Sequence, residues 1–231
     1  MLVLGIDSAT PQVSIAFGDA GEVLGEVRLR SGQRHAEQLA PAIRYLSEEL
    51  GVRLDQLAAV AVGLGPGLFT GLRVGVTTAK VMAQALRIPV VGVPSLDLVA
   101  YPLRHANRLV VTVLDARRRE VFDAAYRPVP GGLQRVSEYQ VRSPAELVAE
   151  LEAGNDELLL AGDGVRAYRA EFETLEHAEL AGRASNAPSA AALIELAMGR
   201  VEREEFDPPW DVHPLYLRKS DAEIEWERKV S

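Results

Sequence analysis

The chain has 231 residues, of which 48% are hydrophobic and 25% charged, and its formal net charge is −8. This composition is typical of a globular protein with one domain or two lobes of about 110 residues each. No cysteine is present, which excludes disulfides, zinc–thiolate sites and cysteine nucleophiles. We expect a cytoplasmic protein that does not span a membrane, because no basic leader opens the sequence and no apolar run approaches about 18 residues.

The acidic balance also bears on nucleic-acid binding. Proteins that bind nucleic acid without a partner protein usually carry a basic face. Short basic runs occur at residues 28–30, 117–119 and 218–219, and runs of this length are typical of solvated surface. Any role near RNA therefore requires a partner that supplies most of the phosphate contacts.

The first half of the chain alternates strand and helix patterns. Apolar alternation predicts strands over residues 2–6, 13–17 and 22–29. Apolar residues on one helix face predict a helix over residues 35–50, which Gly51 ends. A buried strand (57–62), a second helix (70–86) and another strand (89–93) follow, so this half has the predicted order βββαβαβ.

The second half begins in the same way. A strand over residues 109–114 ends at Asp115, and residues 120–126 form its predicted hairpin mate. A capping box at Ser143 and Glu146 begins a helix, and a strand over 158–161 and a helix over 189–200 complete the pattern. This echo of the first half predicts two related α/β lobes, residues 1–105 and 106–231.

The segment GLGPGLFTGLRVG, residues 63–75, joins a strand to the second helix and is poor in side chains. Small residues recur every fourth position and would form one helix stripe: Gly67, Gly71, Gly75, Ala79 and Ala83. Each glycine inside a helix costs roughly 1 kcal/mol relative to alanine. Something must therefore compensate for the exposed backbone.

Three explanations of the stripe are open: a close-packed seam with another helix, a tight internal strand-to-helix turn, and a phosphate cradle at the helix N-terminus. The segment lacks the Lys-Ser/Thr pair of a Walker motif and the glycine spacing of a dinucleotide fingerprint. We favour the seam. We expect the stripe to be a subunit interface flanked by larger apolar residues, namely Leu72, Val76, Leu39 and Ile43.

Several segments together resemble one family, TsaB, also called YeaZ. They are residues 4–10 (LGIDSAT), 34–41 (RHAEQLAP), 63–75, 79–80 (AK), 89–93 (PVVGV), 115–118 (DARR) and 214–218 (PLYLR). The resemblance covers nearly the whole chain. It implies an actin- and hexokinase-like α/β fold of two lobes, each built on a five-stranded mixed sheet with flanking helices.

The resemblance also implies a function. TsaB is a non-catalytic partner of the transferase TsaD, with the ATPase TsaE as a third component, in making threonylcarbamoyladenosine beside the anticodon of tRNA. From this we expect a homodimer in isolation, a heterodimer with a TsaD-like paralogue through the same face, and contact with tRNA only through the complex. No cofactor is expected, although ATP or ADP could bind at a subunit boundary.

Three positions distinguish this chain from TsaD-like or from TsaB-like chains. TsaD-like chains carry two histidines four apart after the third buried strand, where this chain has Ser95 and Val99. Valine cannot bind a metal, so the chain resembles TsaB rather than TsaD. TsaB-like chains usually have serine where this chain has Leu68, and the lost hydroxyl weakens the phosphate-cradle explanation.

A vestigial nucleotide cleft is a further expectation from the superfamily, which holds magnesium at strand-end aspartates. The matching residues are Asp7, Ser8, Asp115, Gly162 and Gly164. An aspartate that merely caps its own turn explains Asp7 equally well. The functional alternative is an ATP-dependent phosphotransferase or ATPase. A peptidase lacks sequence support, because neither a Ser-His-Asp order nor a His-Glu-x-x-His motif is present.

Overall fold

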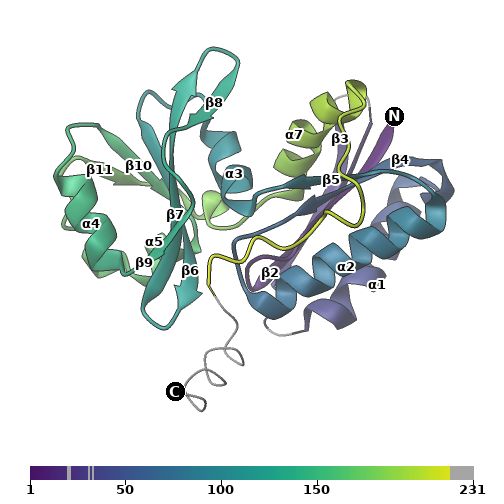
Figure 1. The fold of residues 1–231 in the computed structure, drawn as a ribbon, viewed down its shortest axis with the longest axis horizontal. Helices are drawn as coiled ribbons and strands as arrows, with labels where there is room; N and C mark the ends of the chain where they lie inside the picture. Colours follow the sequence, from purple (N-terminus) through teal and green to yellow (C-terminus); the bar gives the residue numbers. More distant parts are fainter. Residues whose placement is uncertain (20–21, 31, 33, 219–231) are drawn as a thin grey trace.

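The computed structural model describes residues 1–19, 22–30, 32 and 34–218. Its two lobes lie side by side, each with one twisted mixed sheet between helices (Figure 1). Within the described ranges, no helix combines the length and hydropathy needed to cross a membrane.

The first sheet has five strands in the order β3-β2-β1-β4-β5. β1 (Leu2–Asp7), β2 (Gln12–Asp19) and β3 (Glu22–Arg30) form an antiparallel meander, while β4 (Leu57–Gly63) and β5 (Val90–Val93) continue it in parallel. The predicted order βββαβαβ is confirmed. It places the carboxyl end of β1 in the middle of the sheet.

Helices cover both faces of this sheet. α1 (His35–Leu50) and α2 (Phe69–Leu86) lie side by side on one face, where they bury residues such as Leu4, Ile15 and Phe17 (Figure 1). α7 (Ala190–Glu202) packs on the other face against Val3, Ala59 and their neighbours. α3 (Ser95–Ala100) follows β5 and packs on the second lobe.

The second sheet repeats the topology of the first. Its order is β11-β10-β6-β7-β8, formed by β6 (Leu109–Arg117), β7 (Glu120–Val129), β8 (Gly132–Arg135), β10 (Leu158–Ala161) and β11 (Ala178–Leu180). β9 (Gln140–Arg142) is a sixth strand that also pairs with β7. The predicted echo of the two lobes is confirmed, but the second sheet has one strand more than expected.

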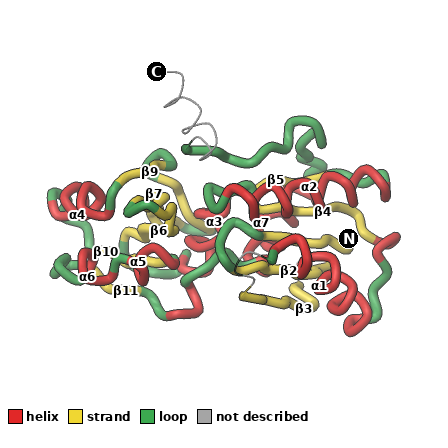
Figure 2. Tube along the Cα trace, turned by 90° about the horizontal axis from the view of Figure 1, so that it is seen from below, coloured by secondary structure: helices red, strands yellow, loops and turns green. Residues whose placement is uncertain are grey.

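Three short helices cover the outer face of the second sheet: α4 (Pro144–Glu152), α5 (Asp163–Ala167) and α6 (Arg169–Phe172). α4 lies at the edge of the molecule far from the first lobe (Figures 1 and 2). Its predicted capping box is confirmed, since Glu146 N donates to Ser143 Oγ at 3.3 Å and Ser143 N donates to Glu146 Oε2 at 2.8 Å. Single 3₁₀ turns at Leu54–Gln56, Tyr101–Leu103 and Arg183–Ser185 complete the structure.

The second lobe is shorter than the predicted range 106–231. α7 packs on the first sheet, and residues 207–218, which we call the strap, return along the first lobe. Asp207 N donates to Val90 O at 3.0 Å and Leu215 N donates to Leu64 O at 2.7 Å. The last residues of that range, 219–231, lie outside the described residues. Hydrophobic patterning missed this return because the strap has no periodicity of its own.

Candidate functional site

The glycine stripe faces its own lobe. A Cβ atom added at Gly67 would lie less than 3.0 Å from the carbonyl oxygen of Ala9, and one added at Gly71 would lie less than 3.0 Å from that of Ser8. The missing side chains therefore make room for the turn between β1 and β2. Our prediction that this stripe is an interface with another subunit is wrong, and the internal turn is the correct explanation.

The remaining predicted interface residues are buried in the same lobe. Their exposed fractions are at most 4% for Leu39, Ile43, Leu72, Val76, Ala79 and Ala83, and Gly75 is also buried. The period of a small-residue stripe identifies a close contact, but it does not say which surface makes that contact. Here β1 and β2 make it, because their connecting turn passes directly under the N-terminal part of α2.

Hydrogen bonds occupy the polar groups at this contact. Leu68 N donates to Ala9 O at 2.7 Å, and Ser8 Oγ donates to Gly71 O at 2.8 Å. His35 Nε2 lies 2.8 Å from Thr10 O. A phosphate cradle would need the Leu68 amide, which the turn already uses.

Asp7 is sealed at the end of β1. Ser95 Oγ donates to Asp7 Oδ2 at 2.6 Å, and Ala9 N donates to Asp7 Oδ1 at 3.0 Å. The carboxylate is only 1% exposed, and a Cβ added at Gly63 would lie less than 3.0 Å from it. Burial raises the pKa of Asp7 above its ordinary value. The side chain caps its own turn and ties β1 to α3, which agrees with the structural explanation of this residue.

Asp115 is the counterpart of Asp7 in the second sheet, at the corresponding end of β6. Arg117 contacts it twice, through a backbone N–H at 2.8 Å and through its guanidinium at 3.0 Å. Gly162 and Gly164 lie against β6 close to Asp115. A Cβ at either position would lie less than 3.0 Å from Val113 of β6, so these glycines allow α5 to approach the sheet. Among the described residues, no group of three or more His, Asp or Glu could hold a metal ion.

Sequence reasoning missed two residues that complete these strand ends. Ser95 is the hydroxyl partner of Asp7, and it was noted only as a position where histidine is absent. Asp163 accepts a hydrogen bond from the Asp115 backbone N–H at 3.0 Å. The sole signal for Asp163 was its place between two glycines, which is equally typical of an ordinary turn.

The Asp163 carboxyl should make stability depend on pH. Burial is the main cause that raises its pKa to about 6, above an unfolded value of about 3.9. Between these pH values the folded chain binds more protons than the unfolded chain, so this group lowers stability as pH rises from about 4 to about 6. We expect the stability of Asp163→Asn to fall less over this pH range. Above pH 6 this variant should unfold at a higher urea concentration than the unaltered chain. Equal midpoints for the two proteins at pH 5 and pH 8 would contradict this.

The structure has an exposed surface on α1 and α2 that was not among the predicted interface residues. Tyr45 of α1 is 56% exposed and Val81 of α2 is 59% exposed. A groove of about 480 Å³ runs between the two helices and is lined by Ala36, Arg73, Val74, Thr77, Thr78, Val81 and Met82. We call the apolar residues that line this groove, Ala36, Val74, Val81 and Met82, the outer face. Exposed apolar groups beside a groove are typical of a protein-binding surface.

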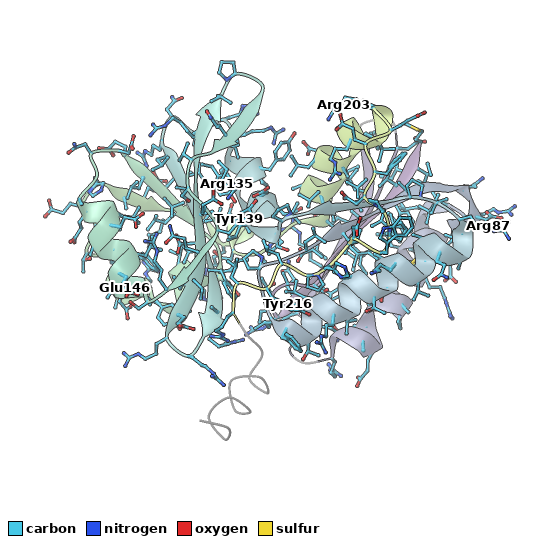
Figure 3. The ribbon with its side chains drawn as sticks, in the orientation of Figure 1. Arg87, Arg135, Tyr139, Glu146, Arg203 and Tyr216 are labelled. Carbon is cyan, nitrogen blue, oxygen red and sulfur yellow. The ribbon has the colours of Figure 1, made fainter. Side chains whose placement is uncertain are left out.

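The strap closes one side of α2. The Tyr216 ring lies 5.1 Å from the Phe69 ring, and Arg73 Nε donates to Tyr216 Oη at 3.2 Å. Lys80 Nζ donates to Val212 O at 3.2 Å. Figure 3 places Tyr216 at the junction between the lobes, beside the N-terminal end of α2. The segment 214–218 therefore holds the first turn of α2 in place.

Comparison with known proteins identifies the family. A family model described as TsaD, tRNA N6-adenosine threonylcarbamoyltransferase, matches residues 24–226. The tRNA threonylcarbamoyladenosine biosynthesis protein TsaB of Bacillus subtilis is 30% identical, and the match covers 98% of each chain. The chain belongs to the TsaB family. The identification made from the sequence motifs is confirmed.

Solved structures agree with this assignment. YeaZ from Pseudomonas aeruginosa has a TM-score of 0.78 at 29% identity, covering 93% of this chain and 100% of that one. An uncharacterised protein from the same organism, described as similar to peptidase YeaZ, has a TM-score of 0.81 at 30% identity, covering 94% and 99%.

Distant structures confirm the predicted fold class. The activator of 2-hydroxyisocaproyl-CoA dehydratase from Clostridium difficile has a TM-score of 0.51 at 12% identity, covering 90% of this chain and 99% of that one. At this identity the likeness concerns the fold alone. This chain has that two-lobed architecture, and its two sheets share the same strand order.

Proposed function

We propose that this TsaB-family chain takes part in threonylcarbamoyladenosine biosynthesis on tRNA as a non-catalytic subunit. It would bind a TsaD-like transferase and act together with a TsaE-like ATPase, and it would meet tRNA only in that complex. Full-length similarity to TsaB of Bacillus subtilis supports the pathway. The observation that carries the non-catalytic role is the sealed state of Asp7, which Ser95 and Gly63 enclose.

The outer face of α1 and α2 is the best candidate for binding the transferase. It presents the exposed apolar side chains of Ala36 and Val81 on two helices whose opposite sides are anchored in the core. A rigid apolar patch loses little conformational entropy on binding. The glycine stripe contributes indirectly, because it seats α2 closely on the β1–β2 turn and so fixes the position of this face.

The same face would serve for self-association. A two-fold contact uses one patch on both chains, so a homodimer and a heterodimer with a structurally similar paralogue would exclude each other. We expect a homodimer in isolation that the transferase converts to a heterodimer, in the cytoplasm. Light scattering of the chain alone and with the transferase would distinguish a mutually exclusive exchange from a larger joint assembly.

The alternative is an ATPase or phosphotransferase that uses Asp115. Its side chain is 13% exposed and paired with Arg117, so it is more accessible than Asp7. Calorimetry with ATP and magnesium tests this on the isolated chain. Tight binding with turnover would favour the enzyme, whereas binding that appears only after the transferase is added would indicate a nucleotide site at the subunit boundary.

The proposed function itself is tested by reconstitution. Threonylcarbamoyl transfer to an unmodified tRNA transcript would be measured with the TsaD-like and TsaE-like proteins, with and without this chain. We expect modification to depend on the chain. Equal rates in its presence and absence would contradict the proposal.

A further inference from the structure

The turn between β6 and β7 consists of arginines in an unfavourable backbone conformation. Arg117, Arg118 and Arg119 have φ angles of 63°, 55° and 62°, and all three are exposed. The strands pair as far as Arg117 and Glu120. Arg118 and Arg119 are therefore the two central residues of the hairpin. We call residues 117–119 the arginine turn.

This geometry favours other residues. Two-residue hairpin turns with positive φ at both central positions prefer Asn-Gly or Asp-Gly. A residue with a Cβ atom pays roughly 1 kcal/mol or more in the left-handed region. The chain thus keeps arginine at positions where its backbone would be more stable with asparagine and glycine. The three arginine side chains lie outside the apolar core of the second lobe.

The two acidic residues that flank the arginine turn in the sequence, Asp115 and Glu120, already have partners. Asp115 is paired with Arg117 at 3.0 Å, and Glu120 is paired with Arg218 of the strap at 2.6 Å. Within the part of the chain that the structure describes, Arg119 has no ion-pair partner. Among the described residues, the charge of Arg119 is therefore not compensated by an ion pair, although the whole chain carries a net charge of −8.

The position of the turn connects it with the α2 side of the molecule. Figure 1 shows the β6–β7 turn at the lower edge of the second lobe, on the side of the molecule where α1 and α2 lie. The strap links the two regions, since Tyr216 stacks on Phe69 of α2 and Arg218 pairs with Glu120 beside the turn. A long polyanion that crosses from a partner bound on α2 could reach the turn.

We propose that the arginine turn contacts the phosphate backbone of the RNA substrate in the assembled complex. This inference rests on the proposed function and adds an RNA contact to it. Guanidinium groups match phosphate oxygens with paired hydrogen bonds. One such turn cannot hold RNA against a net charge of −8, so it strengthens and orients RNA that the transferase already binds.

The test compares RNA binding by complexes with the transferase, using a fluorescent tRNA transcript over a range of salt concentrations. Arg118→Asn/Arg119→Gly removes two charges and supplies the residues that the turn prefers. We expect about tenfold weaker binding and a salt slope that is smaller by about 1 to 2. Arg118→Lys/Arg119→Lys keeps the charge but not the paired hydrogen bonds, so it should retain the salt slope and part of the affinity.

Arg87 supplies a matched control for Arg119. It is an exposed arginine with a φ of 56° at the C-terminal end of α2, far from the arginine turn (Figure 3). Arg119→Gly should weaken RNA binding and Arg87→Gly should not. Equal losses in both would indicate a general charge effect and overturn the inference, as would unchanged binding in the Asn-Gly variant.

The outcome also separates this inference from the proposed function. If the unaltered chain supports tRNA modification and the Asn-Gly variant binds RNA normally, the proposed function stands and the RNA contact is wrong. If the unaltered chain neither joins the transferase nor affects modification, the proposed function fails and the RNA contact fails with it.

Discussion

Replacing Gly71 by alanine is expected to lower the free energy of unfolding by about 1–3 kcal/mol, the usual range for inserting a methyl group into a packed site. The added Cβ would meet the backbone carbonyl oxygen of Ser8 at less than 3.0 Å. This oxygen cannot move without displacing the turn between β1 and β2. The ordinary gain of roughly 1 kcal/mol from replacing a helical glycine by alanine offsets only part of that cost.

Gly75→Ala is the matched control. The group nearest to a Cβ at this position is the Ser8 hydroxyl, a side-chain atom that can rotate away, although it would lose its hydrogen bond to Gly71 O. We therefore expect a smaller loss for Gly75→Ala than for Gly71→Ala in urea unfolding. If both variants were as stable as the unaltered chain but could not form a dimer, the stripe would be a subunit interface after all.

Val81→Asp should have the largest effect on assembly. Val81 is 59% exposed on α2, so a carboxylate there remains solvated in the free chain and leaves its stability nearly unchanged. In a complex the same charge would be buried without a partner. We expect the affinity for the TsaD-like transferase to fall at least about tenfold, as measured by titration calorimetry, with tRNA modification reduced at limiting protein.

Val129→Asp is the control for this substitution. Val129 is 37% exposed at the end of β7 in the second lobe, outside the outer face of α1 and α2. It should bind the transferase as tightly as the unaltered chain does. Normal binding by the Val81 variant, or equal weakening by both variants, would place the partner elsewhere on the molecule.

The order of the long elements could be predicted from the sequence because each carries a strong local signal. Apolar spacing marked α1 as residues 35–50, and the structure has the helix at His35–Leu50. The Ser143 capping box located α4 in the same way. Short elements were missed: β9 has three residues, and α3 has six without a capping side chain.

The function of the glycine stripe could not be predicted because its partner is distant in sequence. Gly71 meets Ser8, which lies 63 residues away, and no local pattern says that this turn will pass under α2. The outer face was missed for a related reason. Ala36 and Val81 are single apolar residues on separate helices, and they line one groove only because α1 and α2 lie side by side.

The non-catalytic role is tested most directly by removing each of the two strand-end carboxylates in turn. The rate of tRNA modification would be measured in the reconstituted system with Asp7→Asn and with Asp115→Asn, after circular dichroism and transferase binding confirm that each variant is folded and assembled. If the chain has no catalytic role, both variants should give modification rates close to that of the unaltered chain. A fall of about a hundredfold or more in either assembled variant, as expected on losing a catalytic acid or base, would contradict it.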